Sequence, residues 1–199
     1  MRLSGPKDPE WDSLWSSVGA GTDGAAPEPN DPAQPNAAAA ASSPSQMRLI
    51  VRTDGAARGN PGPASSGAVL IDASAPGARR PDAVPLASIS EYLGVQTNNV
   101  AEYTAVLRAL ALALEMGARE VEMLLDSKLI VEQLHGRWRV KDAKLIPLHA
   151  EAKSHLARFA RWGATHVPRA QNKQADALCN EAIDRVQAGG PRTVVIRQK

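Results

Sequence analysis

The core of the chain begins with apolar and polar residues that alternate with the two-residue period of β-strands. In MRLIVRTD (residues 47–54), Leu49, Val51 and Thr53 fall on one face and Ile50, Arg52 and Asp54 on the other. Two further apolar segments are predicted as strands: GAVLID (67–72) and PLASISEYL (85–93). The turn-rich segment ASAPGARRPDA (73–83) between them predicts an exposed hairpin loop. Three antiparallel strands are therefore expected first.

After residue 97 the apolar period lengthens to that of an α-helix. NNVAEYTAVLRALALALEMG (98–117) keeps apolar residues at helical spacing, with Asn98 or Asn99 as the N-cap and Gly117 just past the end. The elements predicted next are a buried strand VEMLLD (121–126), a short helix capped by Ser127, a helix from Leu145 or Pro147 to about Trp162, a strand ATHVPR (164–169) and a helix NKQADALCNEAIDRVQ (172–187). This order predicts an α/β fold, a mixed sheet with helices on both faces. VVIR (194–197) is either a weak edge strand or a frayed end.

Residues 1–46 have a different composition. They contain five prolines between Pro27 and Pro44, the run NAAAAASS and few large aliphatic residues. Such a stretch buries too little apolar surface to offset its ordering entropy, so we expect a disordered acidic extension, without the apolar run of a secretory signal. Within it, DPEWDSLWSSV predicts a short amphipathic helix and leaves open an unidentified partner. The predicted organisation is this extension, a folded domain over 47–187 and a tail over 188–199.

Charge is divided unevenly along the chain. Residues 1–46 carry two basic and six acidic side chains, and residues 47–199 carry 21 basic and 15 acidic ones. The basic excess in the core is compatible with a polyanionic partner. The single cysteine, Cys179, lies on the apolar face of the last predicted helix and is expected in the core. With no intrachain disulfide and no run long enough to span a membrane, we expect a cytoplasmic monomer without a membrane partner.

Four carboxylates occupy places where chemistry gathers in α/β folds. Asp54 and Asp126 each end a predicted strand, and Glu102 and Asp176 each lie in the first turn of a helix among apolar positions. Taken singly, each has an ordinary explanation, as a turn residue or as an acid that meets the helix macrodipole. Taken together, converging carboxylates would raise one another's pKa unless cations neutralise them, and such hard oxygen ligands select Mg²⁺ or Mn²⁺. Two ions would clamp the attacking and leaving oxygens of a phosphoryl displacement.

Four blocks of sequence, in this order, resemble ribonuclease H type 1, most closely its archaeal-like bacterial branch: TDGAARGNPGPA, TNNVAEYTAVLRAL, LLDSKLIVEQL and VPRAQNKQADALCNEA. The resemblance covers about residues 47–187 and implies a five-stranded ribonuclease H fold with this span as the catalytic domain. It implies an endoribonuclease that hydrolyses the RNA strand of RNA–DNA hybrids with two Mg²⁺ ions, or Mn²⁺ as a substitute, and leaves 5′-phosphate and 3′-hydroxyl ends. The residues implied as catalytic and metal-binding are Asp54, Glu102, Asp126 and Asp176.

The resemblance also implies contacts with the hybrid. It places Asn60, Asn98 and Asn99 against the minor groove and Thr97 on a DNA phosphate. Amides near the metals suit ribose 2′-hydroxyls, which both donate and accept hydrogen bonds. Helix capping is the competing explanation for Asn98 or Asn99.

Other candidates for substrate contact lie after the third acid. Ser127 and Lys128 follow Asp126, and Lys128 is a candidate phosphate contact where better-known members often carry a glutamine. The segment HGRWRVKDAK (135–144) interleaves basic residues with Trp138, which favours a phosphate-tracking surface, and packing of Trp138 on the core is the alternative.

Many ribonucleases H carry an assisting loop histidine before the last acid. The candidates here are His166, inside a predicted strand, and Arg169 at the end of that strand. We favour Arg169 as a charge stabiliser on the phosphate, since a permanently cationic arginine cannot act as a general base.

Two other functions stay open. One is a non-catalytic module with the same fold that binds hybrid or double-stranded RNA. Its expected mark is a missing acid, and none of the four is missing. The other is an enzyme that cuts RNA–DNA junctions or double-stranded RNA, because shape recognition depends on loops that the sequence does not place.

Overall fold

A six-stranded mixed sheet forms the centre of the structure, a computed structural model that describes residues 47–198. The predicted disordered extension, with its amphipathic segment, lies outside the described residues. In chain order the elements are β1 (Arg48–Ala57), β2 (Gly62–Asp72), β3 (Ala87–Gln96), α2 (Asn98–Glu115), β4 (Glu120–Leu125), α3 (Lys128–Leu134), α4 (Leu145–Leu156), β5 (Arg161–His166), the 3₁₀ turn η1 (Arg169–Gln171), α5 (Lys173–Gln187) and β6 (Thr193–Arg197).

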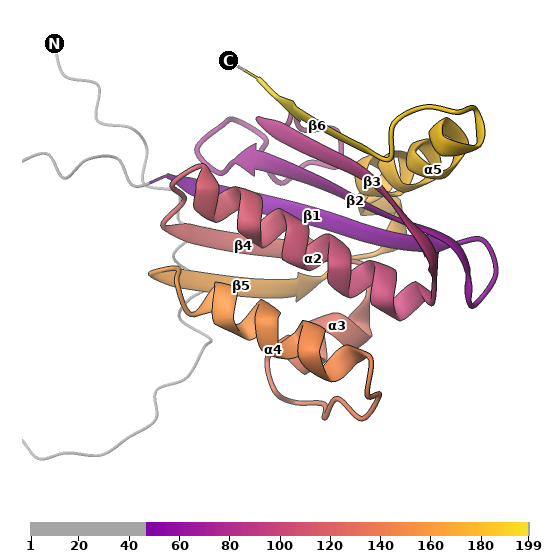
Figure 1. Cartoon of the computed structure of the whole chain (residues 1–199). Helices are drawn as coiled ribbons and strands as arrows, with labels where there is room; N and C mark the ends of the chain where they lie inside the picture. Colours follow the sequence, from indigo (N-terminus) through magenta and orange to yellow (C-terminus); the bar gives the residue numbers. More distant parts are fainter. Residues whose placement is uncertain (1–46, 199) are drawn as a thin grey trace, which may run out of the picture. The chain divides into compact units, whose positions relative to one another are not determined.

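The strands follow the order β5-β4-β1-β2-β3-β6 across the sheet (Figure 1). The first three strands are antiparallel, as predicted, and β4 and β5 continue the sheet in parallel from β1. The expectation of five strands is wrong, because part of the predicted tail forms β6 and pairs antiparallel with β3. That pairing satisfies backbone groups along β3 that would otherwise form an open edge. The stretch VVIR is thus an edge strand rather than a frayed end.

Helices cover both faces of the sheet, as predicted. α2 and α4 lie over one face and α5 over the other (Figure 1). Two glycines allow the first turns of α2 and α5 to approach the strands closely. A Cβ atom on Gly55 would lie 2.0 Å from the backbone nitrogen of Glu102, and one on Gly67 would lie 2.3 Å from the carbonyl oxygen of Ala175. Both helix starts are therefore seated directly against β1 and β2.

The boundary between α4 and β5 differs from the prediction. α4 ends at Leu156, and Trp162 lies in β5 rather than in the helix. The strand pairs in parallel with β4 along its whole length. In addition, the Trp162 ring stacks on His135, with ring centroids 5.4 Å apart, and lies beneath the Lys153 ammonium. These contacts with β4, α3 and α4 override the helical periodicity of the segment.

Cys179 is fully buried under the sheet, which confirms its predicted place in the core. Its Sγ donates a hydrogen bond to the Asp54 carbonyl oxygen over 3.1 Å, and burial raises the pKa of the thiol. The side chain is therefore a neutral packing group that ties α5 to β1. Among residues 47–198, no helix combines the length and the apolar character needed to cross a membrane.

Candidate active site

Asp54 and Asp126 occupy neighbouring positions on adjacent parallel strands. The register pairs Thr53 with Leu125, and each aspartate is the next residue along its strand direction. β1 continues to Ala57, beyond its predicted end at Asp54, because its outer part still pairs with β2. The two carboxylates thus start from the carboxyl ends of the central parallel pair, where ligand sites in α/β sheets gather.

Glu102 reaches the same edge on the first turn of α2. The helix is capped by the Thr97 hydroxyl, which accepts a first-turn N–H over 3.4 Å, so the prediction of Asn98 or Asn99 as the N-cap is wrong. Asn98 instead donates from Nδ2 to Glu102 Oε1 over 2.8 Å. Burial is the main cause that raises the pKa of Glu102, and the hydrogen bond from Asn98 opposes that rise.

Asp176 is supplied by the first turn of α5, on the opposite face of the sheet from α2. Arg169 Nη2 donates to its Oδ1 over 2.6 Å, and Asn180 Nδ2 donates to its Oδ2 over 3.3 Å. The Arg169 side chain is 77% exposed, so water screens this ion pair and it holds the guanidinium only weakly. Arg169 is therefore able to exchange Asp176 for another anion.

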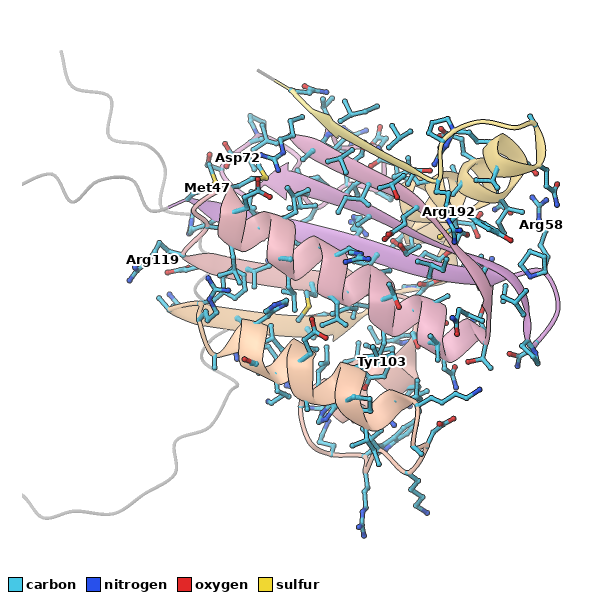
Figure 2. The ribbon with its side chains drawn as sticks, in the orientation of Figure 1. Met47, Arg58, Asp72, Tyr103, Arg119 and Arg192 are labelled. Carbon is cyan, nitrogen blue, oxygen red and sulfur yellow. The ribbon has the colours of Figure 1, made fainter. Side chains whose placement is uncertain are left out.

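The structure brings the four acids predicted from the sequence together around one cleft of about 470 Å³. The cleft is lined by Asp54, Gly55, Ala56, Ala57, Arg58, Asn98, Glu102, Asp126, Arg169, Asp176 and Asn180. Arg58 lies at the opposite end of the sheet from Met47 and Arg119 (Figure 2). The cleft thus opens at the carboxyl ends of β1 and β4.

Electrostatic repulsion in the cleft is concentrated on Asp54. Its pKa is raised to about 7, first by burial and then by the negative charges of Asp126, Asp176 and Glu102. Arg169 opposes the rise. Asp54 Oδ2 has no hydrogen-bond partner among the described residues, although it is buried. A carboxylate in this state favours a proton or a cation.

Comparison with known proteins shows what this arrangement belongs to. A family model described as reverse transcriptase-like matches residues 52–182. The crystal structure of RNase H1 from Halobacterium salinarum is 42% identical over 69% of this chain and 98% of that chain, with a TM-score of 0.63. The structure of LC11-RNase H1 in complex with RNA/DNA hybrid is 40% identical over 70% of this chain and 99% of that chain, also with a TM-score of 0.63. The chain belongs to the ribonuclease H type 1 family.

Some relatives are much longer than the region that matches. The bifunctional protein Rv2228c of Mycobacterium tuberculosis is 42% identical over 138 residues, which cover 69% of this chain and 36% of that protein. The chain spans the same 36% of the length of the other two mycobacterial relatives at this identity. The similarity to these longer proteins is thus to a region of 138 residues.

The carboxylates around the cleft could hold a hard divalent cation through one or two oxygens, but they do not form a complete ligand cage. Among residues 47–198, no three His, Cys, Asp or Glu side chains come close enough together to hold an ion by themselves. However, Asp54 and Glu102 each present a buried carboxylate oxygen that no described residue hydrogen-bonds. Mg²⁺ commonly binds one or two carboxylates and completes its shell with water and substrate phosphate. The site fits that mode.

The remaining predicted contacts surround the cleft to different degrees. Asn60 Oδ1 accepts the Asn98 backbone N–H over 3.2 Å, which ties the glycine-rich loop to the start of α2. Asn99 and Lys128 are exposed at the starts of α2 and α3. Trp138 is 45% exposed and is not among the hydrophobic side chains that pack against the core. None of these last three lines the cleft described above.

The structure separates the two candidates for an assisting group. His166 is exposed at the end of β5 and is not among the residues around the cleft. Arg169 lines the cleft from η1 rather than from the end of a strand, because β5 ends at His166 and not at the predicted residue 169. Its contact with Asp176 places a cation beside the four acids.

Three residues near the acids were not among the predicted site residues. Arg58 has a signal in the sequence, as the basic residue of the loop that follows Asp54. Asn180 also has one, because it lies one helical turn after Asp176. Asn172 resembles an ordinary helix cap before α5, but its side chain caps nothing and contacts Asp126 instead. Only the structure reveals that role.

Proposed function

We propose that this protein is a metal-dependent endoribonuclease that hydrolyses the RNA strand of RNA–DNA hybrids. The observation that carries the proposal is the gathering of Asp54, Glu102, Asp126 and Asp176 around one open cleft, where burial and the neighbouring acids raise the pKa of Asp54. A type 1 relative 40% identical to this chain has been solved in complex with an RNA/DNA hybrid. The same substrate is proposed here, with Mg²⁺ or Mn²⁺ as the cation.

Asp54 and Asp126 would be the main ligands of two cations. Asp176 would complete the site of one cation, and Glu102 would complete the site of the other. The cations, when bound, would supply charge for the scissile phosphate and for an attacking water. Glu102, held by Asn98 through a hydrogen bond of 2.8 Å, would accept hydrogen bonds from that water or from a ribose hydroxyl. In-line attack on phosphorus with departure of the 3′ oxygen gives 5′-phosphate and 3′-hydroxyl ends.

The other side chains would hold the hybrid rather than react. Asn60, Asn98 and Asn99 gather near the start of α2, where amides can read 2′-hydroxyls in the minor groove. Arg169 would move from Asp176 to a phosphate oxygen, because its present ion pair is exposed. Thr97, Ser127 and Lys128 are further proposed contacts.

The decisive experiment is cleavage of an end-labelled RNA–DNA hybrid beside single-stranded and double-stranded RNA, with Mg²⁺, Mn²⁺ or a chelator. The Asp126→Asn protein is the test variant, and Asp82→Asn, which changes an exposed acid outside the cleft lining, is the matched control. We expect cutting of the hybrid's RNA strand alone, dependent on the cation, retained in the control and lost in the test variant. Hybrid binding without cutting would instead support the binding module, and cutting of double-stranded RNA would redirect the substrate assignment.

The exposed basic segment 135–144 predicts a salt-sensitive contact with the hybrid. Arg139 and Trp138 are both exposed there, so the guanidinium is available to a phosphate. The Arg139→Gln change is expected to reduce the slope of log affinity against log salt by about 1, the value for one lost phosphate contact. Fluorescence anisotropy with a labelled hybrid at several salt concentrations measures it. Arg158→Gln, which changes an exposed residue after α4, should leave the slope unchanged.

A further inference from the structure

Arg52 is a fully buried cation in the middle of β1, two residues before Asp54. Its Nη1 donates to the Gln171 carbonyl oxygen over 2.7 Å, and its Nη2 donates to the Arg79 carbonyl oxygen over 2.5 Å. The Arg79 side chain in turn makes a two-pronged ion pair with buried Glu122 of β4, with distances of 2.7 and 2.6 Å. The guanidinium of Arg52 is thus directed at backbone carbonyls, one of which belongs to η1.

Asn172 follows η1 directly and is also fully buried. Its Nδ2 donates to the Thr53 carbonyl oxygen and to Asp126 Oδ1, each over 2.8 Å. One amide therefore joins the residue before Asp54 to the carboxylate that follows β4. Its backbone carbonyl accepts the Asp176 N–H over 3.2 Å, which joins the same residue to the fourth acid.

We propose that Arg52 and Asn172 are positioning residues that form a buried clamp, which fixes η1 against β1 and sets the orientation of Asp126 and the place of Arg169. Only the expected effect of the clamp on cleavage rests on the proposed function. Arg52 holds the last residue of η1, and Asn172 holds the Asp126 carboxylate by one oxygen and leaves the other to the cleft. Neither side chain lines the cleft itself, so neither contacts the substrate.

A purely structural role for Arg52 can be separated from a clamp by substitution. Buried charged groups often stabilise a fold no better than apolar side chains of similar size. Removal of Arg52 would leave the Arg79–Glu122 ion pair intact and would remove one buried cation. A residue kept only for stability would therefore be replaceable by methionine, whereas a clamp would not.

The test compares Arg52→Met and Asn172→Ala with wild type and with Gln174→Ala. Gln174 donates to the Ala83 carbonyl oxygen from the same end of α5 and hydrogen-bonds to no carboxylate of the described residues, so its loss reports the cost of an ordinary, partly buried hydrogen bond. Three quantities are measured: hydrogen exchange of the backbone amides of residues 169–172 without metal, Mg²⁺ affinity by calorimetry, and kcat and KM on the hybrid.

In both clamp variants we expect exchange of these amides to become at least about tenfold faster. We also expect Mg²⁺ affinity and kcat to fall by about 10–100-fold, which is the usual effect of losing a partner of a metal ligand. The KM for the hybrid should stay within about twofold of the wild-type value. The control should match wild type in all three. Unchanged exchange, or an unchanged kcat in an intact variant, overturns the clamp. Failure of wild type to cut would overturn the proposed function, and exchange together with calorimetry would still decide the clamp.

Discussion

Replacement of Asp54 by asparagine is expected to abolish cleavage and, at the same time, to stabilise the protein in the absence of divalent cations at pH 8. Asparagine keeps the shape of the side chain but removes the charge that a cation would meet. Since loss of an outer partner of a metal ligand already costs about 10–100-fold, loss of the ligand should cost at least about 1,000-fold in kcat. The stability gain has a separate electrostatic origin.

The pKa of Asp54, raised to about 7 by burial and by the neighbouring acids, sets the pH range of that gain. The folded state binds this proton more tightly than the unfolded state, whose aspartate has an ordinary pKa. The stabilisation by the bound proton is therefore complete below about pH 4 and is lost as the pH rises through about 7. Above that pH, wild type carries a buried, repelled charge that asparagine lacks. We expect the variant to be more stable by on the order of 2 kcal/mol at pH 8 and equal to wild type near pH 4.

Thermal unfolding in chelator at pH 4, 6 and 8 measures the difference, with the exposed Asp82→Asn change as the control. At pH 8 the midpoint of Asp54→Asn should rise by roughly 5 °C, given about 2–4 °C per kcal/mol for a domain of this size. Saturating Mg²⁺ should stabilise wild type more than the variant and narrow the gap. A variant less stable than wild type at pH 8 would mean that Asp54 is a structural hydrogen-bonding group.

The places of the acids followed from simple patterns in the sequence. A strand that ends on an acid, twice, and a helix that begins with an inward acid, twice, are local signals, and the right topology brings such positions to one edge of a sheet. Local signals also explain the buried Cys179, which lies on the apolar face of an amphipathic helix. Where the position of a residue depends on its neighbours in sequence, the sequence alone was enough to predict it.

The errors share a different cause, which is contact between distant segments. β6 forms because β3 offers an open edge more than 90 residues earlier in the chain; the local pattern of VVIR allowed a weak edge strand but did not indicate its partner. Trp162 lies in β5 rather than in the predicted helix because it pairs with β4 and stacks on His135. Arg52 lies in a strand with alternating apolar and polar residues, and the sequence does not show that it is buried. The carbonyl groups that it contacts belong to Arg79 and Gln171, which are distant in sequence. Such roles depend on tertiary structure that a single sequence does not display.

Gly55→Ala is expected to be the most destabilising small substitution in the domain. A Cβ atom at this position would lie 2.0 Å from the Glu102 backbone nitrogen and 2.5 Å from its Cα. These backbone atoms belong to the first turn of α2 and cannot move aside without shifting the helix. Overpacking costs about 1–3 kcal/mol where side chains can adjust, so we expect about 3 kcal/mol or more here and a fall in the unfolding midpoint of about 10 °C.

The control is Gly117→Ala. Gly117 follows the C-terminal end of α2, whereas Gly55 lies in β1 and packs against the start of that helix. Gly117 has a φ of +82° and nothing within 4 Å of its would-be Cβ, so its substitution costs about 1 kcal/mol of backbone strain without a clash. Gly55→Ala should exceed this cost severalfold and should also lower kcat in whatever protein still folds, because the displaced turn carries Glu102. Equal losses of stability for the two changes would show that α2 can shift away from β1 at little cost in free energy. The position of Glu102 would then depend on its hydrogen bond with Asn98 rather than on the glycine contact, so the two results together decide which feature of the sequence holds the second acid in place.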